Sequence, residues 1–265
     1  MKILKIAFIM CSLIFTIGSS FADAAADIVN FKHCKVFCLQ DAASSMPASL
    51  FTDVENTGYK QTSDKYPSSV NVFVLSKDGV NYMIDAGNPQ PRGSLKRRLE
   101  AMRISPDGIS AIFITHIHPD HVGGLVWNGK PLFKNATLHI AKLEYEAWKK
   151  DENRRNLAQY LKPYEKQLNL FEYGTELPGG LMPIKMSGHT PGHTVFRFED
   201  EKGKYAYFVG DILHAAALQM PHPSFCARYD MNPAEAVASR RAVLKLEKTF
   251  LFGAHYPFPG FWEQK

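Results

Sequence analysis

The chain has 265 residues, of which 45% are hydrophobic and 22% are charged, and its formal net charge is +5. This balance is typical of a globular protein and excludes collagen-like, coiled-coil and multi-span membrane proteins. Lysines and arginines are spread along the chain, and the longest basic run is Lys96-Arg97-Arg98, so we expect no nucleic-acid partner. No linker or block of charge interrupts the chain, which predicts a single domain.

The amino-terminal residues have the pattern of an export signal. Two lysines precede an apolar run from Ile6 to Ile17, and small residues follow as far as Ala22. The run is too short to cross a bilayer, which takes about twenty apolar residues. We therefore expect a signal peptide over residues 1–22, a mature domain over residues 23–265, a periplasmic or secreted location and no stable membrane span after cleavage. A retained membrane anchor is the alternative.

Removal of the leader changes both the charge and the cysteine content. The net charge falls from +5 to +3, because two lysines and no acidic residue are lost. Cys11 also leaves, while Cys34, Cys38 and Cys226 remain. Cys34 and Cys38 lie in an expected strand over Phe31–Leu39, where four residues separate them by roughly 13 Å, too far for a disulfide. We therefore expect buried free thiols.

The first half of the mature chain contains a strong hairpin signal. Val70–Ser76 and Val80–Asp85 are apolar runs joined by Lys77-Asp78-Gly79. Hydrophobic periodicity predicts the elements that follow. These are a helix over Gly93–Arg103, a strand over Ala111–Thr115, a strand over Thr137–Ile140 and a helix over Leu143–Lys150.

The second half shows a similar order of strands and helices. Its expected elements are strands over Leu181–Met186, Thr194–Phe198 and Tyr205–Val209, a helix over Ala234–Leu246 that starts at Asn232-Pro233, and a strand over Phe250–Phe252. Strands that alternate with helices predict an α/β protein. The order of elements also suggests two similar halves packed face to face.

The most informative segment is Thr115–Gly124, which follows an expected strand. His116 and His118 lie two apart on an extended backbone, so both imidazoles project to the same side and can bind one metal ion. Asp120 and His121 turn the other way and can serve a second ion. Polar ligands at the end of such a strand are typical of a site on an α/β scaffold.

This motif resembles that of the metallo-β-lactamase superfamily. Later landmarks follow in that family's order, namely Gly188-His189-Thr190-Pro191-Gly192-His193-Thr194, then Gly210-Asp211, and then Gly253-Ala254-His255. Within the superfamily, the stretches that begin at Gly210 and Gly253 look closest to the exported group similar to methyl parathion hydrolase. The resemblance implies a four-layer αββα sandwich, in which helices flank two mixed β-sheets.

The resemblance also implies a ligand set for two divalent metal ions. The implied ligands of the first ion are His116, His118 and His193, those of the second are Asp120, His121 and His255, and the bridging ligand is Asp211. Zn²⁺ is the expected ion. Manganese, iron and cobalt remain open, because nitrogen and carboxylate ligands suit them too. Asp120 is also the expected catalytic residue, which takes up the proton freed during attack.

Other residues near the motifs have expected supporting roles. The resemblance places Trp148 in the aromatic wall of a substrate pocket, and His214 where lactonases of the superfamily carry a substrate-contacting tyrosine. His189 shares a glycine-rich turn with His193, and we expect it to hydrogen-bond beside the centre rather than bind metal. Asp85 is either an orienting partner of a ligand histidine or a turn-forming aspartate. The histidines expected on the surface or in packing are His33, His139 and His222.

Together these residues predict a binuclear metal-dependent hydrolase of small neutral esters. A lactone, a carboxyl ester or a phosphotriester would be attacked by a metal-bridging hydroxide. The ligand motifs contain no arginine pair that could clamp an anionic substrate, which favours a neutral one. β-Lactam or thioester hydrolysis and an inactive metal-binding module are the alternatives, and both a monomer and a homodimer remain open. Five residues follow Gly260, where relatives continue through a final strand region, so we expect either that a closing element is missing or that the chain is truncated.

Overall fold

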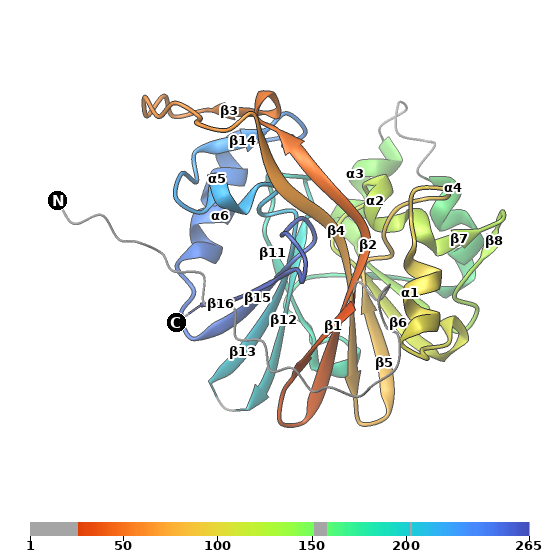
Figure 1. Ribbon diagram of the computed structural model, residues 1–265. Coiled ribbons are helices and arrows are strands. Elements are labelled where there is room, and N and C mark those ends of the chain that lie inside the picture. Colours follow the sequence, from red (N-terminus) through yellow and green to blue (C-terminus); the bar gives the residue numbers. More distant parts are fainter. Residues whose placement is uncertain (1–25, 151–157, 202, 265) are drawn as a thin grey trace.

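The structure is a computed structural model that describes residues 26–150, 158–201 and 203–264. The expected signal peptide over residues 1–22 lies outside the described residues. Two large β-sheets pack against each other, and helices lie on their outer faces (Figure 1). No helix within the described ranges combines the length and the apolar character that a membrane crossing requires.

The larger sheet has seven strands in the order β1-β2-β4-β5-β6-β9-β10. Its first four strands pair antiparallel, and β5, β6, β9 and β10 pair in parallel. The parallel strands therefore end at the same edge of the sheet. The bounds are β1 (Ala26–Asn30), β2 (Cys34–Pro47), β4 (Lys65–Lys77), β5 (Val80–Ile84), β6 (Ile109–Ile114), β9 (Thr137–Ala141) and β10 (Leu168–Phe171).

The smaller sheet has five strands in the order β11-β12-β13-β15-β16. Strands β13 and β15 pair in parallel, and the other neighbours pair antiparallel. The bounds are β11 (Met182–Lys185), β12 (Thr194–Glu201), β13 (Lys204–Gly210), β15 (Thr249–Gly253) and β16 (Phe261–Gln264). Two small ribbons pair β3 (Phe51–Asp53) with β14 (Phe225–Ala227), and β7 (Val126–Trp127) with β8 (Lys130–Pro131).

Aromatic side chains fill the space between the two large sheets. Phe73 and Phe113 of the larger sheet pack with Phe196, Phe208 and Phe252 of the smaller one, and all five are buried. Burial of such rings removes a large apolar area from water and favours the face-to-face packing of the sheets. This cluster is the central core of the molecule.

The helices cover the outer faces of the sheets. Leu99 packs against the larger sheet in one apolar cluster with Ile112, and Val243 packs against the smaller sheet with Leu251. The expected four-layer αββα sandwich is therefore confirmed. The bounds of the helices are α1 (Leu95–Ala101), α2 (Pro119–Val122), α3 (Lys142–Lys150), α4 (Ala158–Leu161), α5 (Ala216–Gln219) and α6 (Pro233–Leu244).

Local turn and capping signals act as the sequence predicts. The hairpin between β4 and β5 turns at Asp78 and Gly79, whose φ angles are 51° and 76°. Such left-handed pairs match the twist of a two-residue hairpin. At the start of α6, the side chain of Asn232 accepts a hydrogen bond from the backbone N–H of Glu235. This N-cap fixes where the helix begins.

Two parts of the fold differ from the prediction. Strands β2 and β4 extend to Pro47 and back to Lys65, and they form a long arm that carries β3 beyond the sheet (Figure 1). The arm was missed because its serine-rich ends lack apolar alternation. The residues after Gly260 form a strand that the sequence pattern did not predict, and this strand, β16, pairs with β15 at the edge of the smaller sheet.

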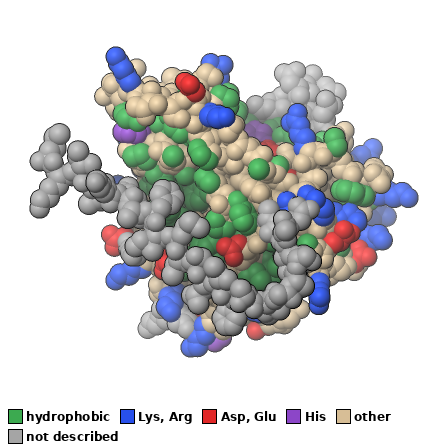
Figure 2. Space-filling view, viewed as in Figure 1, with side chains coloured by type: hydrophobic (Ala, Val, Ile, Leu, Met, Phe, Trp, Pro, Cys, Tyr) green, Lys and Arg blue, Asp and Glu red, His purple; other side chains and the backbone are tan. Residues whose placement is uncertain are grey.

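The thiols and the surface charges follow the expected pattern. Cys34, Cys38 and Cys226 are free and buried, which confirms their prediction. On the face that Figure 2 shows, lysine and arginine side chains lie among acidic and neutral ones, without one continuous basic patch. The core therefore rests on packing, with no disulfide within the described ranges.

Candidate metal centre

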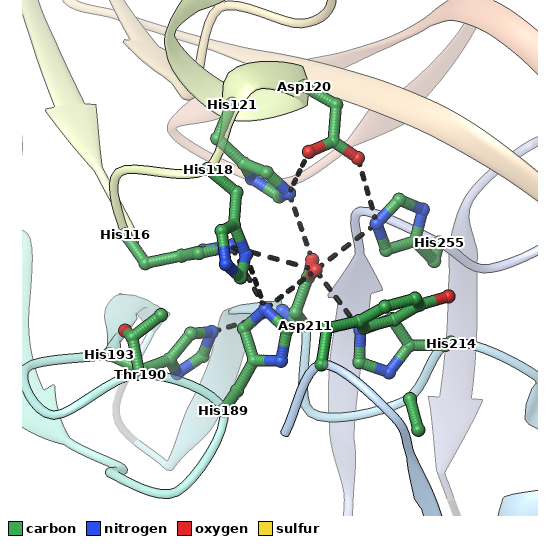
Figure 3. A network of polar contacts seen from close by, with 12 residues as sticks. His116, His118, Asp120, His121, His189, Thr190, His193, Asp211, His214 and His255 are labelled. Carbon is green, nitrogen blue, oxygen red and sulfur yellow. Dashed lines mark hydrogen bonds and ion pairs between the residues drawn. The ribbon is translucent and has the colours of Figure 1, made fainter. Parts of the chain in front are cut away.

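Three imidazoles form the first cluster of ligand-type side chains. His116 and His118 follow the carboxyl end of β6, and His189 lies in the loop between β11 and β12. Nε2 of His189 is 2.8 Å from Nδ1 of His118 and 3.1 Å from Nε2 of His116. The nitrogens of His116 and His118 are themselves 2.8 Å apart. Loops from both sheets therefore direct three nitrogens to one point (Figure 3).

A second cluster contains one carboxylate and two imidazoles. Asp120 and His121 lie on α2, and His255 follows β15. Nε2 of His255 is 3.4 Å from Oδ2 of Asp120, and Nε2 of His121 is 3.9 Å from its Oδ1. The Asp120 side chain is 30% exposed, whereas both histidines are buried. This cluster is therefore the part of the centre that solvent reaches.

Asp211 lies between the two clusters. It follows β13, and its Oδ2 atom is 3.2 Å from Nε2 of His189 and 3.2 Å from Nε2 of His255. Its Oδ1 atom is 3.1 Å from Nε2 of His121. Burial alone would raise the pKa of Asp211, but the charges of His121 and His255 outweigh it and hold the pKa well below its usual range. One ionised carboxylate thus faces the ligands of both clusters.

The structure reverses the expected roles of His189 and His193. His189 joins the cluster, whereas Nε2 of His193 accepts a hydrogen bond from the backbone N–H of Asp211, and its Nδ1 lies 3.2 Å from the carbonyl oxygen of Met186. Both ring nitrogens of His193 are therefore used by the backbone. His193 supports the position of Asp211, and the ring of His189 takes the place that we expected for His193.

Several buried polar atoms at the centre make no hydrogen bond of acceptable geometry within the described part of the chain, although they lie close to one another. Nε2 of His121, Oδ1 of Asp211 and both ring nitrogens of His214 are buried without a hydrogen bond of acceptable geometry. Burial lowers the pKa of His116 and of His118 well below its ordinary value, so both imidazoles are neutral and offer lone pairs. Unpaired buried polar atoms are rare. Neutral imidazoles with carboxylates are a donor set that fits two divalent cations.

Asp85 contacts His121 on the ring nitrogen that faces away from Asp211. Its Oδ2 atom is 2.8 Å from Nδ1 of His121 and accepts a hydrogen bond from the hydroxyl of Thr115. Its Oδ1 atom accepts from the backbone N–H of Thr115. Asp85 follows β5 with a φ of 59°. Asp85 therefore has both of the roles that were expected as alternatives: it forms a turn, and it orients the ligand-type histidine His121.

Asp230 holds His189 in a similar way. Its Oδ1 atom is 2.9 Å from Nδ1 of His189, and its Oδ2 atom is 3.3 Å from the guanidinium of Arg240 on α6. Burial alone would lower the pKa of His189, but Asp211 and Asp230 outweigh it and raise the pKa to about 9. Sequence reasoning missed Asp230, because a single aspartate in an irregular segment carries no motif.

The two expected substrate-binding residues are both buried beside the centre. Trp148 is buried, and its ring centroid is 5.3 Å from that of His118, so it backs a ligand-type side chain. His214 is also buried, with Nε2 3.2 Å from Oδ2 of Asp211. The partly exposed aromatic residue beside the centre is Tyr229, whose ring centroid is 5.1 Å from that of His214. Tyr229 belongs to none of the motifs and could not be predicted from them.

Comparisons with known sequences identify the family of the chain. The chain belongs to the metallo-β-lactamase superfamily, whose family model matches residues 66–255. An N-acyl homoserine lactonase of Bacillus cereus is 32% identical over 167 residues, which are 59% of this chain and 60% of that protein. An N-acyl homoserine lactonase of a Bacillus species is 32% identical over 111 residues, 39% of this chain and 38% of that protein. The alignments therefore span less than two thirds of either relative.

Two solved structures are similar over most of the chain. The hydrolase AbOPH of the β-lactamase superfamily superposes with a TM-score of 0.80 at 25% identity, over 91% of this chain and 93% of that one. AidC, a dizinc quorum-quenching lactonase with a bound product, superposes with a TM-score of 0.77 at 23% identity, over 91% of this chain and 94% of that one. Both likenesses support the assigned fold. Membership of the exported subgroup stays a prediction.

Proposed function

We propose that this protein is a binuclear metal-dependent lactone hydrolase. The observation that carries the proposal is the position of Asp211, which lies within 3.2 Å of nitrogens from both clusters. A single carboxylate shared in this way is the arrangement that a two-metal hydrolase requires. The identity of the bond cleaved rests on the two N-acyl homoserine lactonases that align with the chain.

The metal-binding part of the proposal assigns seven ligands and Zn²⁺ as the ion. We assign His116, His118 and His189 to one ion, Asp120, His121 and His255 to the other, and Asp211 to both. Imidazole and carboxylate ligands of this kind are the ordinary ligands of zinc. Two such ions, when bound, would supply Lewis-acid polarisation of an ester carbonyl and lower the pKa of a water molecule.

Asp120 is the residue that we assign as the proton acceptor of the reaction. Asp120 is the most exposed carboxylate of the centre, and its contacts with His121 and His255 hold its pKa below the usual range against the effect of burial. It is therefore ionised at neutral pH and can accept the proton released during attack. His214, whose Nε2 atom lies 3.2 Å from Oδ2 of Asp211, borders the centre beside Tyr229.

Neutral esters fit this centre better than anionic ones. The side chains that converge on Asp211 are imidazoles and carboxylates, and Arg240 is buried behind Asp230 with its guanidinium engaged. A phosphate monoester or free carboxylate is commonly held by a forked arginine contact, which the described centre does not offer. Tyr229, partly exposed beside His214, supplies an apolar face for the remainder of a substrate.

The decisive experiment measures bound metal and substrate turnover on one purified sample. We expect two equivalents of zinc, and chelator-sensitive hydrolysis of an N-acyl homoserine lactone that exceeds hydrolysis of an aryl ester, a phosphotriester, a β-lactam or a thioester. A preference for any of these other substrates would contradict the lactone assignment. Two bound ions with no turnover of any substrate would instead support an inactive metal-binding module.

We also propose export of the protein, on the pattern of residues 1–22. Cell fractionation and amino-terminal sequencing of the mature protein test this proposal. We expect the protein outside the cytoplasm with a start close to residue 23. A full-length protein recovered from the cytoplasm would contradict export. Light scattering on the same material would distinguish a monomer from a homodimer.

A further inference from the structure

Glu144 is a fully buried carboxylate that none of the roles above uses. It lies in the first turn of α3, and its two oxygens accept four hydrogen bonds. Oε1 accepts from the backbone N–H of Ile117, at 3.0 Å, and from the indole N–H of Trp148. Oε2 accepts from the hydroxyl of Thr190, at 2.8 Å, and from the backbone N–H of Gly192, at 2.9 Å. A buried carboxylate is tolerated only when its lone pairs are satisfied in this way.

The donors to Glu144 belong to two separate ligand loops. Ile117 lies between His116 and His118 in the loop that follows β6 of the larger sheet. Thr190 and Gly192 follow His189 in the loop between β11 and β12 of the smaller sheet. Glu144 is therefore hydrogen-bonded to both loops that form the three-imidazole cluster, although these loops come from different sheets.

The close approach of α3 to the second loop fixes this geometry. A Cβ atom added to Gly192 would lie 2.3 Å from the backbone nitrogen of Glu144, which is closer than side chains can approach. Only glycine leaves room for the contact. One turn further along α3, Trp148 donates to the same carboxylate, and its ring lies 5.3 Å from the ring of His118. The helix thus contacts the cluster through two side chains.

We propose that Glu144 is a positioning residue that aligns His116 and His118 with His189 for one of the two metal ions. Elsewhere the two loops are joined by the backbone N–H of Thr194, which donates to the carbonyl oxygen of Thr115, and by contacts between the ligand imidazoles. Glu144 is the side chain that connects the segment around Ile117 to the segment Thr190–Gly192. This inference rests on the metal-binding part of the proposed function and is independent of which ester is cleaved.

The variant Glu144→Gln tests the proposal. Glutamine keeps the shape of the side chain, but its amide N–H₂ replaces one acceptor and faces two donors. We expect the affinity for one of the two zinc ions to fall by about 10-fold to 100-fold, as for other residues that orient metal ligands, while the second ion stays bound. Zinc affinity is measured by competition with a chromophoric chelator. Glu146→Gln is the matched control, because it makes the same charge change on α3 outside these contacts, and both ions should bind it as in the wild type.

Rescue by zinc separates positioning from loss of folding. Saturating zinc should restore the turnover number of Glu144→Gln, because an aligned centre forms once the ion is bound. Thr190→Val removes one of the four donors and leaves the carboxylate in place, so it should weaken the same ion in the same direction by a smaller factor. This variant keeps the test available if Glu144→Gln fails to fold.

The outcomes for the inference and for the proposed function are distinct. Wild-type affinity for both ions in Glu144→Gln, or in Thr190→Val if the first variant is unfolded, would overturn the positioning role, whatever the substrate. A selective loss of one ion in Glu144→Gln would support the positioning role even if the wild type cleaves no lactone. Absence of lactone cleavage by the wild type would contradict only the lactone assignment. The affinity measurement therefore tests Glu144, and the turnover measurement tests the reaction.

Discussion

Oδ1 of Asp230 lies 2.9 Å from Nδ1 of His189, and the opposite nitrogen of the same ring lies 3.2 Å from Oδ2 of Asp211. One imidazole is thus held between a carboxylate outside the centre and the carboxylate at its middle. A histidine that donates to a carboxylate in this way keeps one tautomer and one orientation. The orientation of His189 therefore depends on Asp230, which lies outside the two clusters.

Replacement of Asp230 is expected to weaken metal binding without removing a ligand. In Asp230→Ala the ring of His189 loses its partner, and we expect zinc affinity to fall by about 10-fold to 100-fold. A competition titration with a chelator measures this change. Asp107→Ala, at an exposed aspartate, is the control and should bind zinc as the wild type does. Unchanged affinity in Asp230→Ala would show that His189 is held in place by other contacts.

The exchange of roles between His189 and His193 gives a second prediction. His189→Ala should lose one equivalent of bound zinc, because it removes a nitrogen from the first cluster. His193→Gln should retain both equivalents with weaker binding, because its contacts are with the backbone of Asp211 and Met186. Metal content after gel filtration measures both. Loss of one equivalent in His193→Gln and not in His189→Ala would restore the assignment expected from the sequence.

Asp211→Ala should affect both ions at once. The carboxylate faces nitrogens of both clusters, so its removal takes a ligand from each. We expect lactone hydrolysis to fall by at least about 10³-fold, since the shared ligand of a two-metal centre is lost. Metal content and turnover are measured on the same sample. An Asp211→Ala protein with two ions and full activity would rule out the bridging role.

His139 gives a prediction about stability in acid. It is buried beside Phe113, at a ring distance of 4.9 Å, and burial lowers its pKa from 6.5 to about 4. The unfolded chain takes up this proton near pH 6.5 and the folded chain only near pH 4. The stability that the neutral ring contributes is therefore fully present above pH 6.5 and is lost as the pH falls to 4, by about 3 kcal/mol.

The measurement for His139 is urea unfolding of chelator-treated protein at several pH values. His139→Gln does not titrate in this range, so its free energy of unfolding should fall less steeply between pH 6.5 and pH 4.5 than that of the wild type. The comparison with the variant removes the contribution of the other histidines. Parallel curves for the two proteins would contradict the assigned cause.

The elements that depend on residues a few positions apart could be predicted from the sequence. The hairpin at Asp78-Gly79 and the start of α6 at Asn232 follow from turn and capping chemistry within a few residues. The arm formed by β2 and β4 and the edge strand β16 depend on pairing between distant segments. Such pairing is set by tertiary contacts, which a single sequence shows only weakly.

The centre was predictable where its residues share one short backbone segment. His116 and His118 could be assigned from an extended spacing of two. His189 and His193 lie four apart in a turn that contains Gly188 at a φ of 127°, and such a path does not reveal which ring faces inward. Asp230 and Glu144 act through contacts 41 and 27 residues away in sequence, and neither belongs to a motif.

The origin of the ligands on both sheets links the occupancy of the centre to the stability of the whole domain. Ligand-type side chains that follow β6 meet others that follow β13 and β15, so unfolding would separate the donors of each ion. An ion that binds only the folded chain raises its free energy of unfolding by about 1.4 kcal/mol for every tenfold rise in free ion above the dissociation constant. The concentration of free zinc would therefore set how long the protein survives heat or proteolysis, independently of its reaction.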